Sequence, residues 1–445
     1  ITRLLADMEE NNRLVVYQAD SKYTWWTRMS IQQADCILLV VNAERAPELK
    51  RVEQCLQWAY ESMDVRIDLV VVGDSVHEEP EVDDGYYYEE EEEMTVSDQL
   101  NNWSEQRKWV SGHHLVRKPL KRYPQDFQRM CRRVSGRSVG LVLGGGGARG
   151  LAHLGVIRAL QEAGVTVDHV GGTSQGAFVG ALYARQPDDY DMVYKACQEM
   201  ADQMSSVSSK LFDLTLPMTS MFSGRTFNRS IRKLLGKMRI QDLVLNFFCI
   251  SVDLQKQQQI VHQKGILWKF VRASMSLTGY LPPVAENGSL LVDGGYLNAV
   301  PADVMRHQMG AKIVIAVDVS PESERVYFDY GAHLSGWWLL WNSWNPFVKT
   351  VQVPSMGDIS DLLIWVSSEQ HRKSVKLCSD LHLTPPIQNY GTLEYDKFDE
   401  IIQTGYEYAK PLVDEFVAQN PWLVTETPRR SNTFHKKVEN KLDES

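Results

Sequence analysis

Short apolar runs separated by polar or glycine-containing segments recur along most of the chain. In its first part, β-branched runs at 14–17, 36–41 and 68–72 predict strands, and residues 47–61 predict a helix. From residue 138 the pattern is stronger. Buried strands are predicted there at 139–143, 167–171, 247–252, 290–292 and 313–319. Both regions are therefore of the α/β type.

The spacing of apolar and small residues predicts helices between the later strands. An apolar residue recurs every three positions from Leu151 to Leu160, and Gly164 supplies a C-cap signal. Small residues recur every four positions from Gly176 to Ala184, which lets a helix lie close to a sheet. Strand–helix alternation over about 180 residues predicts a mainly parallel sheet with helices on both faces.

The charge of the chain comes from one tract. The formal net charge is −10, and residues 78–93 hold ten carboxylates with no Lys or Arg. Outside them, 47 acidic residues balance 47 basic ones. Ten like charges cannot pack together, so the tract predicts a disordered loop. This distribution argues against a nucleic-acid binder that relies on net charge.

Two further segments could meet a membrane. Residues 107–137 hold ten Lys or Arg against the single Asp126, which indicates either a solvated helix face or a basic patch for anionic lipid headgroups. Residues 336–347 hold four of the twelve Trp residues. They fit either a core or lid segment, or a patch at a membrane interface, where Trp is favoured.

The remaining composition is that of a globular protein from a reducing compartment. The six Cys residues lie far apart and show no metal-binding spacing. No apolar run reaches the roughly 18 residues that a spanning helix needs. Because the chain starts at Ile1, we expect it to be a fragment, with any membrane anchor outside it.

A glycine-rich loop follows the strand at 139–143. The pattern Gly145-x-Gly147-x-x-Gly150 matches the dinucleotide-binding fingerprint, but Asp168, at the distance of the ribose-binding acid, opens the next strand instead of ending it. The glycines could also serve only a tight turn. The third possibility is an anion cradle, in which backbone amides at a helix N-terminus face a developing oxyanion.

The next strand runs into a GxSxG sequence. Ser174 lies between Gly172 and Gly176 at a predicted strand-to-helix turn, where a nucleophile elbow belongs. A serine hydroxyl needs a base. Asp293, which ends a strand before a glycine turn, is one candidate, although an isolated Asp-Gly is more often a turn residue. The other candidates are the downstream histidines His307, His333, His371 and His382.

The motifs GGGxRG, GxSxG and DGG, in this order, resemble the patatin-like phospholipase family, and more closely its neuropathy target esterase branch. The resemblance covers about residues 139–420, with residues 12–60 similar to the region just upstream in that branch. Further matching segments are 219–222, 227–230, 271–276, 279–283, 293–301 and 334–338. Gln175 and Ala299 depart from the family pattern.

The resemblance implies a three-layer α/β sandwich with a Ser–Asp dyad and no metal or other cofactor. Ser174 would be the nucleophile and Asp293 its general base. The oxyanion hole would be formed by the amides of Gly145, Gly146 and Gly147, with Arg149 at the loop end. A carboxylate is a weaker base than imidazole, so such a dyad depends on a shielded site.

The implied activity is that of a lysophospholipase, which cleaves fatty-acyl esters of phospholipids and lysophospholipids such as lysophosphatidylcholine. The implied location is the cytosolic face of an intracellular membrane such as the endoplasmic reticulum. A membrane anchor and cyclic-nucleotide-binding-like domains, known in this branch, would precede Ile1. A non-catalytic lipid-binding scaffold and a dinucleotide-binding enzyme are the alternatives.

Together, these patterns predict five consecutive segments. They are an α/β segment at 1–77, an acidic loop and basic linker, partly disordered, at 78–137, a patatin-like catalytic domain at 138–320, a C-terminal extension packed on it at 321–423 and a disordered tail at 424–445.

Overall fold

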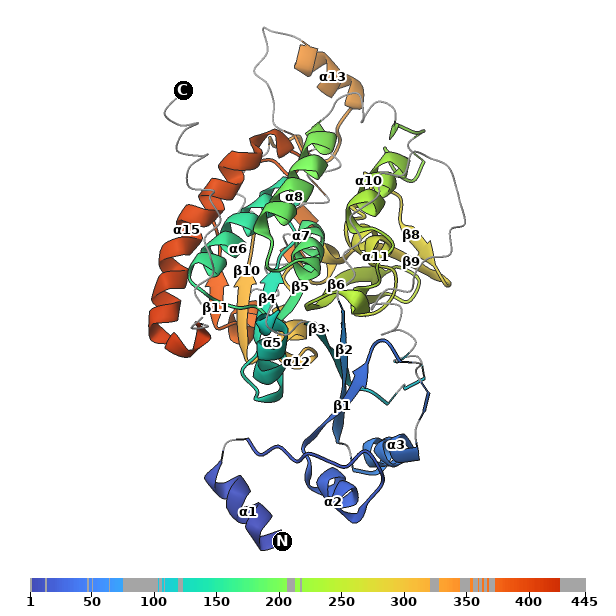
Figure 1. Cartoon of the computed structure of the whole chain (residues 1–445). Coiled ribbons are helices and arrows are strands. Elements are labelled where there is room, and N and C mark those ends of the chain that lie inside the picture. The colour runs from blue at the N-terminus through green and yellow to red at the C-terminus, as the bar shows by residue number, and fades with distance from the viewer. Residues whose placement is uncertain are drawn as a thin grey trace.

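The computed structural model of the chain contains two β-sheets with their helices (Figure 1). It describes residues 2–12, 14–45, 48–49, 51–63, 65–74, 103, 106–107, 109–118, 123–205, 213–216, 218–320, 328–344, 353–354, 359, 362–363, 366–367 and 373–424. The acidic tract at 78–93 and residues 425–445 lie outside the described residues, so their predicted disorder stays a prediction.

The smaller sheet has three parallel strands in the order β1-β2-β3. Its elements are α1 (Thr2–Asn11), α2 (Trp25–Gln33), β1 (Cys36–Asn42), α3 (Arg51–Met63), β2 (Arg66–Asp74) and β3 (Gly112–Lys118). Ile31 of α2 and Leu56 of α3 cover Ile67 of β2 in one apolar cluster. The strands and the helix predicted between 36 and 72 are therefore confirmed.

Two sequence-based expectations for this region are wrong. Residues 14–17 form no strand, and Leu14 and Val16 are exposed, because these side chains have no sheet face to cover. The stretch predicted as a basic linker contains β3, which pairs with β2, and the helix α5 (Pro124–Val134). β3 carries Gly and two His residues, a composition that does not suggest a strand; its pairing with β2 decides its conformation.

The larger sheet has eight strands. They are β4 (Val139–Leu143), β5 (His169–Thr173), β6 (Asn246–Asp253), β7 (Gln258–His262), β8 (Val284–Glu286), β9 (Ser289–Asp293), β10 (Ile313–Val317) and β11 (Leu381–Leu383). The order is β11-β10-β4-β5-β6-β9-β8, with β7 also paired to β6. From β11 to β6 all neighbours are parallel, whereas β7, β9 and β8 join in antiparallel pairs. The predicted mainly parallel core is thus present.

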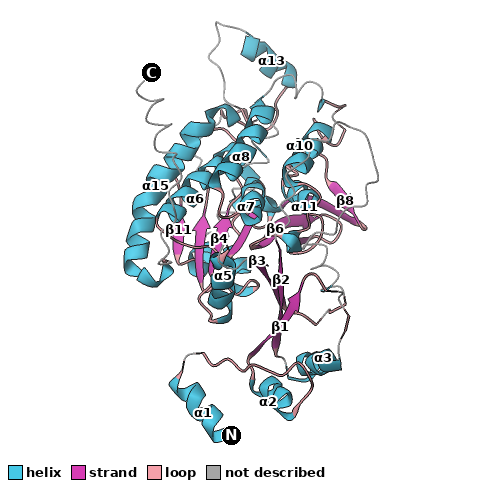
Figure 2. Ribbon diagram, in the orientation of Figure 1, coloured by secondary structure: helices cyan, strands magenta, loops and turns pink. Residues whose placement is uncertain are grey.

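Helices cover both faces of this sheet, which gives the expected three layers (Figure 2). The first face packs against α6 (Ala152–Glu162), α7 (Gln175–Arg185), α8 (Tyr190–Ser205), α10 (Arg225–Leu235), α11 (Leu267–Ser274) and α15 (Phe398–Gln419). The second packs against α12 (Ala302–His307) and residues 375 and 378. Along β4, Leu141 and Leu143 face the first layer while Val142 faces the second, as the two-residue period of a strand requires.

Described residues after 320 add to this fold. β11 adds a parallel strand to the edge of the sheet at β10, and Ile401 and Val413 of α15 are fully buried in the first layer. Short 3₁₀ turns complete the fold at η1 (Gly147–Leu151), η2 (Ile240–Asp242), η3 (Gly294–Tyr296), η4 (Tyr395–Lys397) and η5 (Pro421–Leu423). The C-terminal region therefore supplies part of the sheet as well as a covering helix.

Candidate active site

The C-terminal ends of two strands meet beside β6. β7 pairs with residues 249–253 of β6 and so occupies one side of that strand. β5 pairs with 246–250 and β9 with 251–253, so both lie along the other side. β5 ends with Thr173 opposite Ile250, and the antiparallel β9 ends with Asp293 opposite Ser251. Ser174, the next residue after β5, therefore lies at the point where Asp293 ends its strand.

Ser174 occupies the sharp turn between β5 and α7. Its φ is 54° and its ψ is −122°, a strained conformation for a residue with a side chain and one that is typical of a nucleophile elbow. Its amide donates to Ser274 Oγ at 2.9 Å. A Cβ at Gly176 would lie 2.1 Å from the Leu143 carbonyl oxygen, so only glycine lets α7 start this close to β4.

Asp293 is buried, with 2% of its surface exposed. Its amide donates to the Ser276 carbonyl at 3.1 Å, and its Oδ1 accepts from the Gly295 amide at 2.8 Å. The bond from Gly295 is the Asx-type turn expected of an Asp-Gly sequence. It fixes one carboxylate oxygen in a site shielded from water.

The glycine loop lies directly beside Ser174. A Cβ at Gly145 would be 3.3 Å from the Ser174 Cβ. The Gly145 amide, however, donates to the Ala299 carbonyl at 3.0 Å, and the Ala148 amide donates to the Thr392 carbonyl at 2.8 Å. In the described part of the chain, the amides of Gly146 and Gly147 have no acceptor. Of the three amides predicted for the oxyanion hole, these two remain for a ligand.

The side chain of Arg149 contacts a distant part of the chain. The residue is 5% exposed, and its guanidinium contacts a segment about 240 residues later, donating to the Thr392 hydroxyl at 3.2 Å and the Tyr390 carbonyl at 3.5 Å. Thr392 and Ser274 are two contacts of this site that sequence reasoning missed. Ser274 lies in the family-matching segment 271–276, but that match gave it no role, and Thr392 lies in none of the matching segments. Only the fold brings each residue to the site.

Known proteins resemble the chain in both of its parts. The model of patatin-like phospholipases matches residues 141–306, and that of the P-loop like domain of the neuropathy target esterase family matches residues 1–138. The chain belongs to the patatin-like phospholipases, in their neuropathy target esterase branch.

Individual relatives agree with this assignment. Patatin-like phospholipase domain-containing protein 7 of Mus musculus is 41% identical over 93% of this chain, and protein 6 of Homo sapiens is 40% identical over 97%. Lysophospholipase NTE1 of Pyricularia oryzae is 38% identical over 97%. The chain spans about a third of the length of these curated relatives, 31%, 32% and 31% respectively. Among solved structures, VipD from Legionella pneumophila covers 62% of this chain and 67% of its own, at 15% identity and a TM-score of 0.36.

The histidines considered as alternative bases lie elsewhere in the patatin-like domain. His307, in α12, has its Nε2 3.8 Å from Cys378 Sγ. His382, in β11, is 3.9 Å from Asp318 at the opposite edge of the sheet from β9. His333 is exposed in the loop before α13, and His371 lies outside the described residues. The described histidine that touches the glycine loop is His153, whose Nε2 lies 2.8 Å from the Gly144 carbonyl oxygen.

The dinucleotide interpretation of the glycine loop is contradicted by the position of Asp168. This residue precedes β5, whereas the glycine loop follows the parallel strand β4, so the two lie at opposite ends of the sheet. Asp168 accepts from Arg132 Nη2 at 2.7 Å and from the Val139 amide at 2.9 Å. It therefore serves an ion pair inside the protein. Among the described residues, no cluster of His, Cys, Asp or Glu could hold a metal ion.

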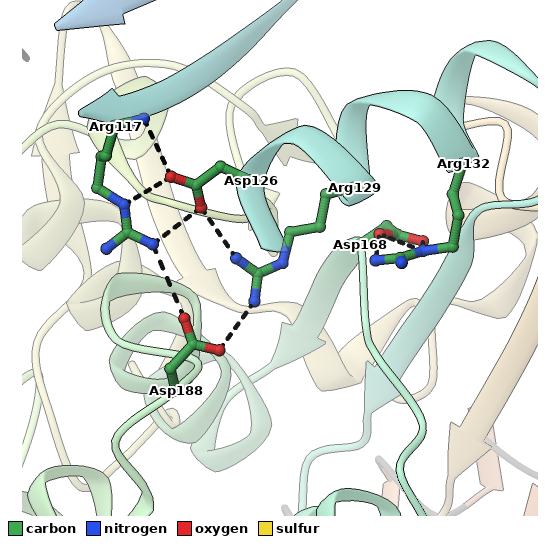
Figure 3. Close-up of polar contacts among 6 residues, drawn as sticks. All are labelled: Arg117, Asp126, Arg129, Arg132, Asp168 and Asp188. Atoms are coloured by element: carbon green, nitrogen blue, oxygen red, sulfur yellow. Dashed lines mark hydrogen bonds and ion pairs between the residues drawn. The ribbon is translucent and has the colours of Figure 1, made fainter. Parts of the chain in front are cut away.

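Half of the ten basic residues in the basic segment are engaged inside the protein, which neither interpretation of its charge expected. Arg117 and Arg129 share Asp126 and Asp188, and Arg132 binds Asp168 (Figure 3). Two more of the ten basic residues are also engaged: Arg107 pairs with Glu53, and Arg133 donates to Asn246 of β6. Arg117, Arg129, Arg132 and Arg133 link β3 and α5 to the patatin-like domain, whereas Arg107 binds within the smaller region. None of these five arginines is available for a lipid-binding patch, which stays a prediction for the other basic residues. Lys108, Lys121 and Arg122 lie outside the described residues.

Two buried histidines predict loss of stability in mild acid. Burial lowers the pKa of His153 and of His262 to about 4, against about 6.5 in an unfolded chain. Between these values the unfolded state binds protons that the folded state does not. The free energy of unfolding should therefore fall as the pH drops from about 6.5 to 4, by up to roughly 3 kcal/mol for each histidine.

Urea denaturation at pH 7.5, 6 and 5 measures this effect. His262→Gln can keep a hydrogen bond to Ser251 Oγ, which lies 2.6 Å from His262 Nε2, and should flatten the pH dependence. His307→Gln, at an exposed position, serves as the control and should leave it unchanged. An equal slope in the wild type and His262→Gln would show that His262 does not contribute.

Proposed function

We propose that the chain is a lipid acyl hydrolase of the lysophospholipase type, with Ser174 as nucleophile and Asp293 as general base. One observation carries the proposal: the ends of β5 and β9 bring a strained serine turn and a buried carboxylate together. The glycine loop, with two unoccupied amides in the described structure, lies against the same serine.

The proposed reaction has two stages. Asp293 takes the proton of Ser174 as Oγ attacks the ester carbonyl, and the oxyanion accepts hydrogen bonds from the amides of Gly146 and Gly147. Each such donor is worth on the order of 3 kcal/mol in the transition state. When the ester C–O bond breaks, Asp293 returns the proton to the leaving alcohol. Water then attacks the acyl-enzyme with the same base, which releases the fatty acid and restores Ser174.

The substrate class follows from the family. The printed names of relatives include patatin-like phospholipase and lysophospholipase, which supports phospholipids and lysophospholipids as substrates here, with lysophosphatidylcholine as the specific proposal. We also propose that the protein works on the cytosolic face of an intracellular membrane such as the endoplasmic reticulum, as the family resemblance implies. Among the described residues no helix is long and apolar enough to cross a bilayer.

Fluorophosphonate labelling tests the proposed function most directly. The probe should modify Ser174, identified by peptide mapping, and the purified chain should release fatty acid from lysophosphatidylcholine. Binding to liposomes without labelling or turnover would instead support a lipid-binding scaffold. A rise in melting temperature with NAD(P), without labelling, would support a dinucleotide-binding enzyme.

The helix α13 (Gly336–Trp344) is the proposed contact with the membrane. It carries no charged residue, and Trp337 and Trp341 are 83% and 72% exposed. In Figure 1 it lies beyond the end of α8, away from the small sheet. Exposed Trp side chains on an uncharged helix favour the headgroup region of a bilayer over water.

Replacing both exposed tryptophans should weaken membrane binding. Trp337→Ala/Trp341→Ala removes two large apolar side chains, and we expect binding to phosphatidylcholine vesicles to fall about 10-fold or more. Hydrolysis of a soluble ester should be unchanged. Trp58→Ala, at a 53% exposed position on α3, is the matched control. Vesicle sedimentation that is equal for all three proteins would remove α13 from the interface.

A further inference from the structure

We infer that residues 390–395, far beyond the patatin-family match at 141–306, position the oxyanion hole, with Thr392 as the central positioning residue. This inference rests on the proposed function, because it assigns a role within that same site. Residues 390–395, called the 390–395 segment below, precede α15 and include the start of η4. The segment contacts the glycine loop and also the residue that follows Ser174.

The first contact is between backbones. The Thr392 carbonyl accepts from the Ala148 amide at 2.8 Å, immediately after the two amides that have no acceptor in the described structure. Gly147 has a φ of +58°, and a Cβ there would lie 2.3 Å from the Thr392 carbonyl oxygen. The loop and the segment thus approach as closely as backbones can. A glycine-rich loop has many accessible conformations, and this contact selects one of them.

The second contact involves the Arg149 side chain. Its guanidinium is buried and donates to the Thr392 hydroxyl at 3.2 Å and to the Tyr390 carbonyl at 3.5 Å. Arg149 lies two residues after Gly147, so Thr392 holds the loop through both its backbone and its side chain. Arginine is suited to this task because its planar fork can satisfy several acceptors at once.

The third contact reaches the nucleophile turn. Tyr395 OH donates to Gln175 Oε1 at 3.3 Å, and the two residues are 5% and 1% exposed. Burial raises the pKa of Tyr395, so its hydroxyl keeps the proton that it donates. Gln175 follows Ser174 directly. A single segment therefore contacts both halves of the proposed catalytic centre.

The 390–395 segment is itself held rigidly. Within it, the Gly391 amide donates to Glu394 Oε2 at 2.8 Å, and Tyr390 OH donates to Glu400 Oε1 of α15 at 3.0 Å. The helix α15 in turn packs in the same core as α6, which begins directly after the glycine loop. The glycine loop is therefore joined to the packed helices in two ways: through α6, which follows it in the chain, and through the 390–395 segment, which is bonded to α15.

If the amides of Gly146 and Gly147 point away from the oxyanion, the rate of the chemical step should fall, whereas the affinity for substrate should change little. Loss of one oxyanion donor costs about 10²–10³ in kcat, so a partly misaligned loop should cost about 10-fold or more. Because the donors act on the transition state, KM should change little. A defect in lipid binding would not produce this separation. A smaller folded fraction would lower the apparent kcat, but it would leave the rate constant for labelling of the remaining enzyme unchanged.

The experiment compares variants of the full chain on a soluble aryl ester, with kcat, KM and the rate of fluorophosphonate labelling at Ser174 as readouts. Thr392→Val removes the acceptor hydroxyl with little change in shape and should lower kcat and the labelling rate about 10-fold, with KM within about twofold. Thr392→Ser keeps the hydroxyl and should restore the activity. Thr384→Val, directly after β11, is the control, since the Thr384 hydroxyl lies 3.3 Å from Tyr408 OH of α15 and, among the described residues, has no hydrogen bond to the 390–395 segment.

Two further variants keep the inference testable if Thr392→Val fails to fold. Arg149→Met should resemble Thr392→Val, and the double variant should be no worse than either single one, because both break one contact. Tyr395→Phe removes only the hydroxyl that reaches Gln175 and should also lower kcat. Wild-type kcat in both Thr392→Val and Tyr395→Phe overturns the inference, as does a loss that appears equally in Thr384→Val. A wild-type chain with neither labelling nor turnover overturns the proposed function and this inference together.

Discussion

Ser174→Ala is expected to reduce ester hydrolysis to the uncatalysed background, and Asp293→Asn to lower kcat about 10³-fold or more. The first change removes the atom that attacks the carbonyl. The second keeps the shape of the side chain and its acceptor for the Gly295 amide, but an amide cannot take up the Ser174 proton. Initial rates on lysophosphatidylcholine, with fatty-acid release as the readout, measure both effects.

Both variants should fold as the wild type does. The amide of residue 174 can still donate to Ser274 Oγ, and Asn at position 293 can satisfy the same turn. Equal melting temperatures, within about 2 °C, check this point. Full turnover in a purified Asp293→Asn protein would contradict the dyad and direct attention to His307, His333, His371 and His382, each of which can then be replaced by Gln.

The second large effect is on stability. Arg132→Met should lower the free energy of unfolding by about 3–5 kcal/mol, because it leaves the carboxylate of Asp168 buried without its cation. Asp168 is 2% exposed, and burial raises its pKa although Arg132 opposes the shift. Arg132 holds it with three hydrogen bonds of 2.7 to 3.1 Å. A domain is stabilised by only about 5–15 kcal/mol in total, so the variant should be close to unfolding at 37 °C.

Urea denaturation with two companion variants separates charge from packing. Arg137→Met changes an exposed arginine three residues after α5 and should cost less than about 0.5 kcal/mol. In Arg132→Met/Asp168→Asn the buried charge is gone, while the Asn carbonyl can still accept from the Val139 amide. This double variant should recover much of the lost stability. If it is no more stable than Arg132→Met, the loss comes from the packing of the arginine stem and not from an unpaired charge.

The elements nearest to the proposed chemistry could be predicted from the sequence because their signals are local. β4 was predicted with its observed bounds, and the GxSxG turn is the site of the positive φ at Ser174. Glycine at 172 and 176 is the sequence signal of that turn, although the close backbone that requires it includes Leu143 of β4 as well as the turn itself. Asp293 ends a strand next to a glycine turn, as its sequence indicates. Patterns of this kind depend on neighbours along the chain, so a single sequence contains them.

Contacts between residues that are far apart in the sequence were decided by the tertiary structure alone. The sequence could not show that β5 and β9 end side by side along β6, because that depends on which strands pair. Basic residues look alike in a sequence whether they face solvent or, as Arg132 does, neutralise a buried carboxylate. Thr392 meets Ala148 of the glycine loop across about 240 residues of chain, and no motif marks the position of Thr392. Such contacts form only when the fold closes long loops, so their geometry belongs to the whole structure rather than to any segment of it.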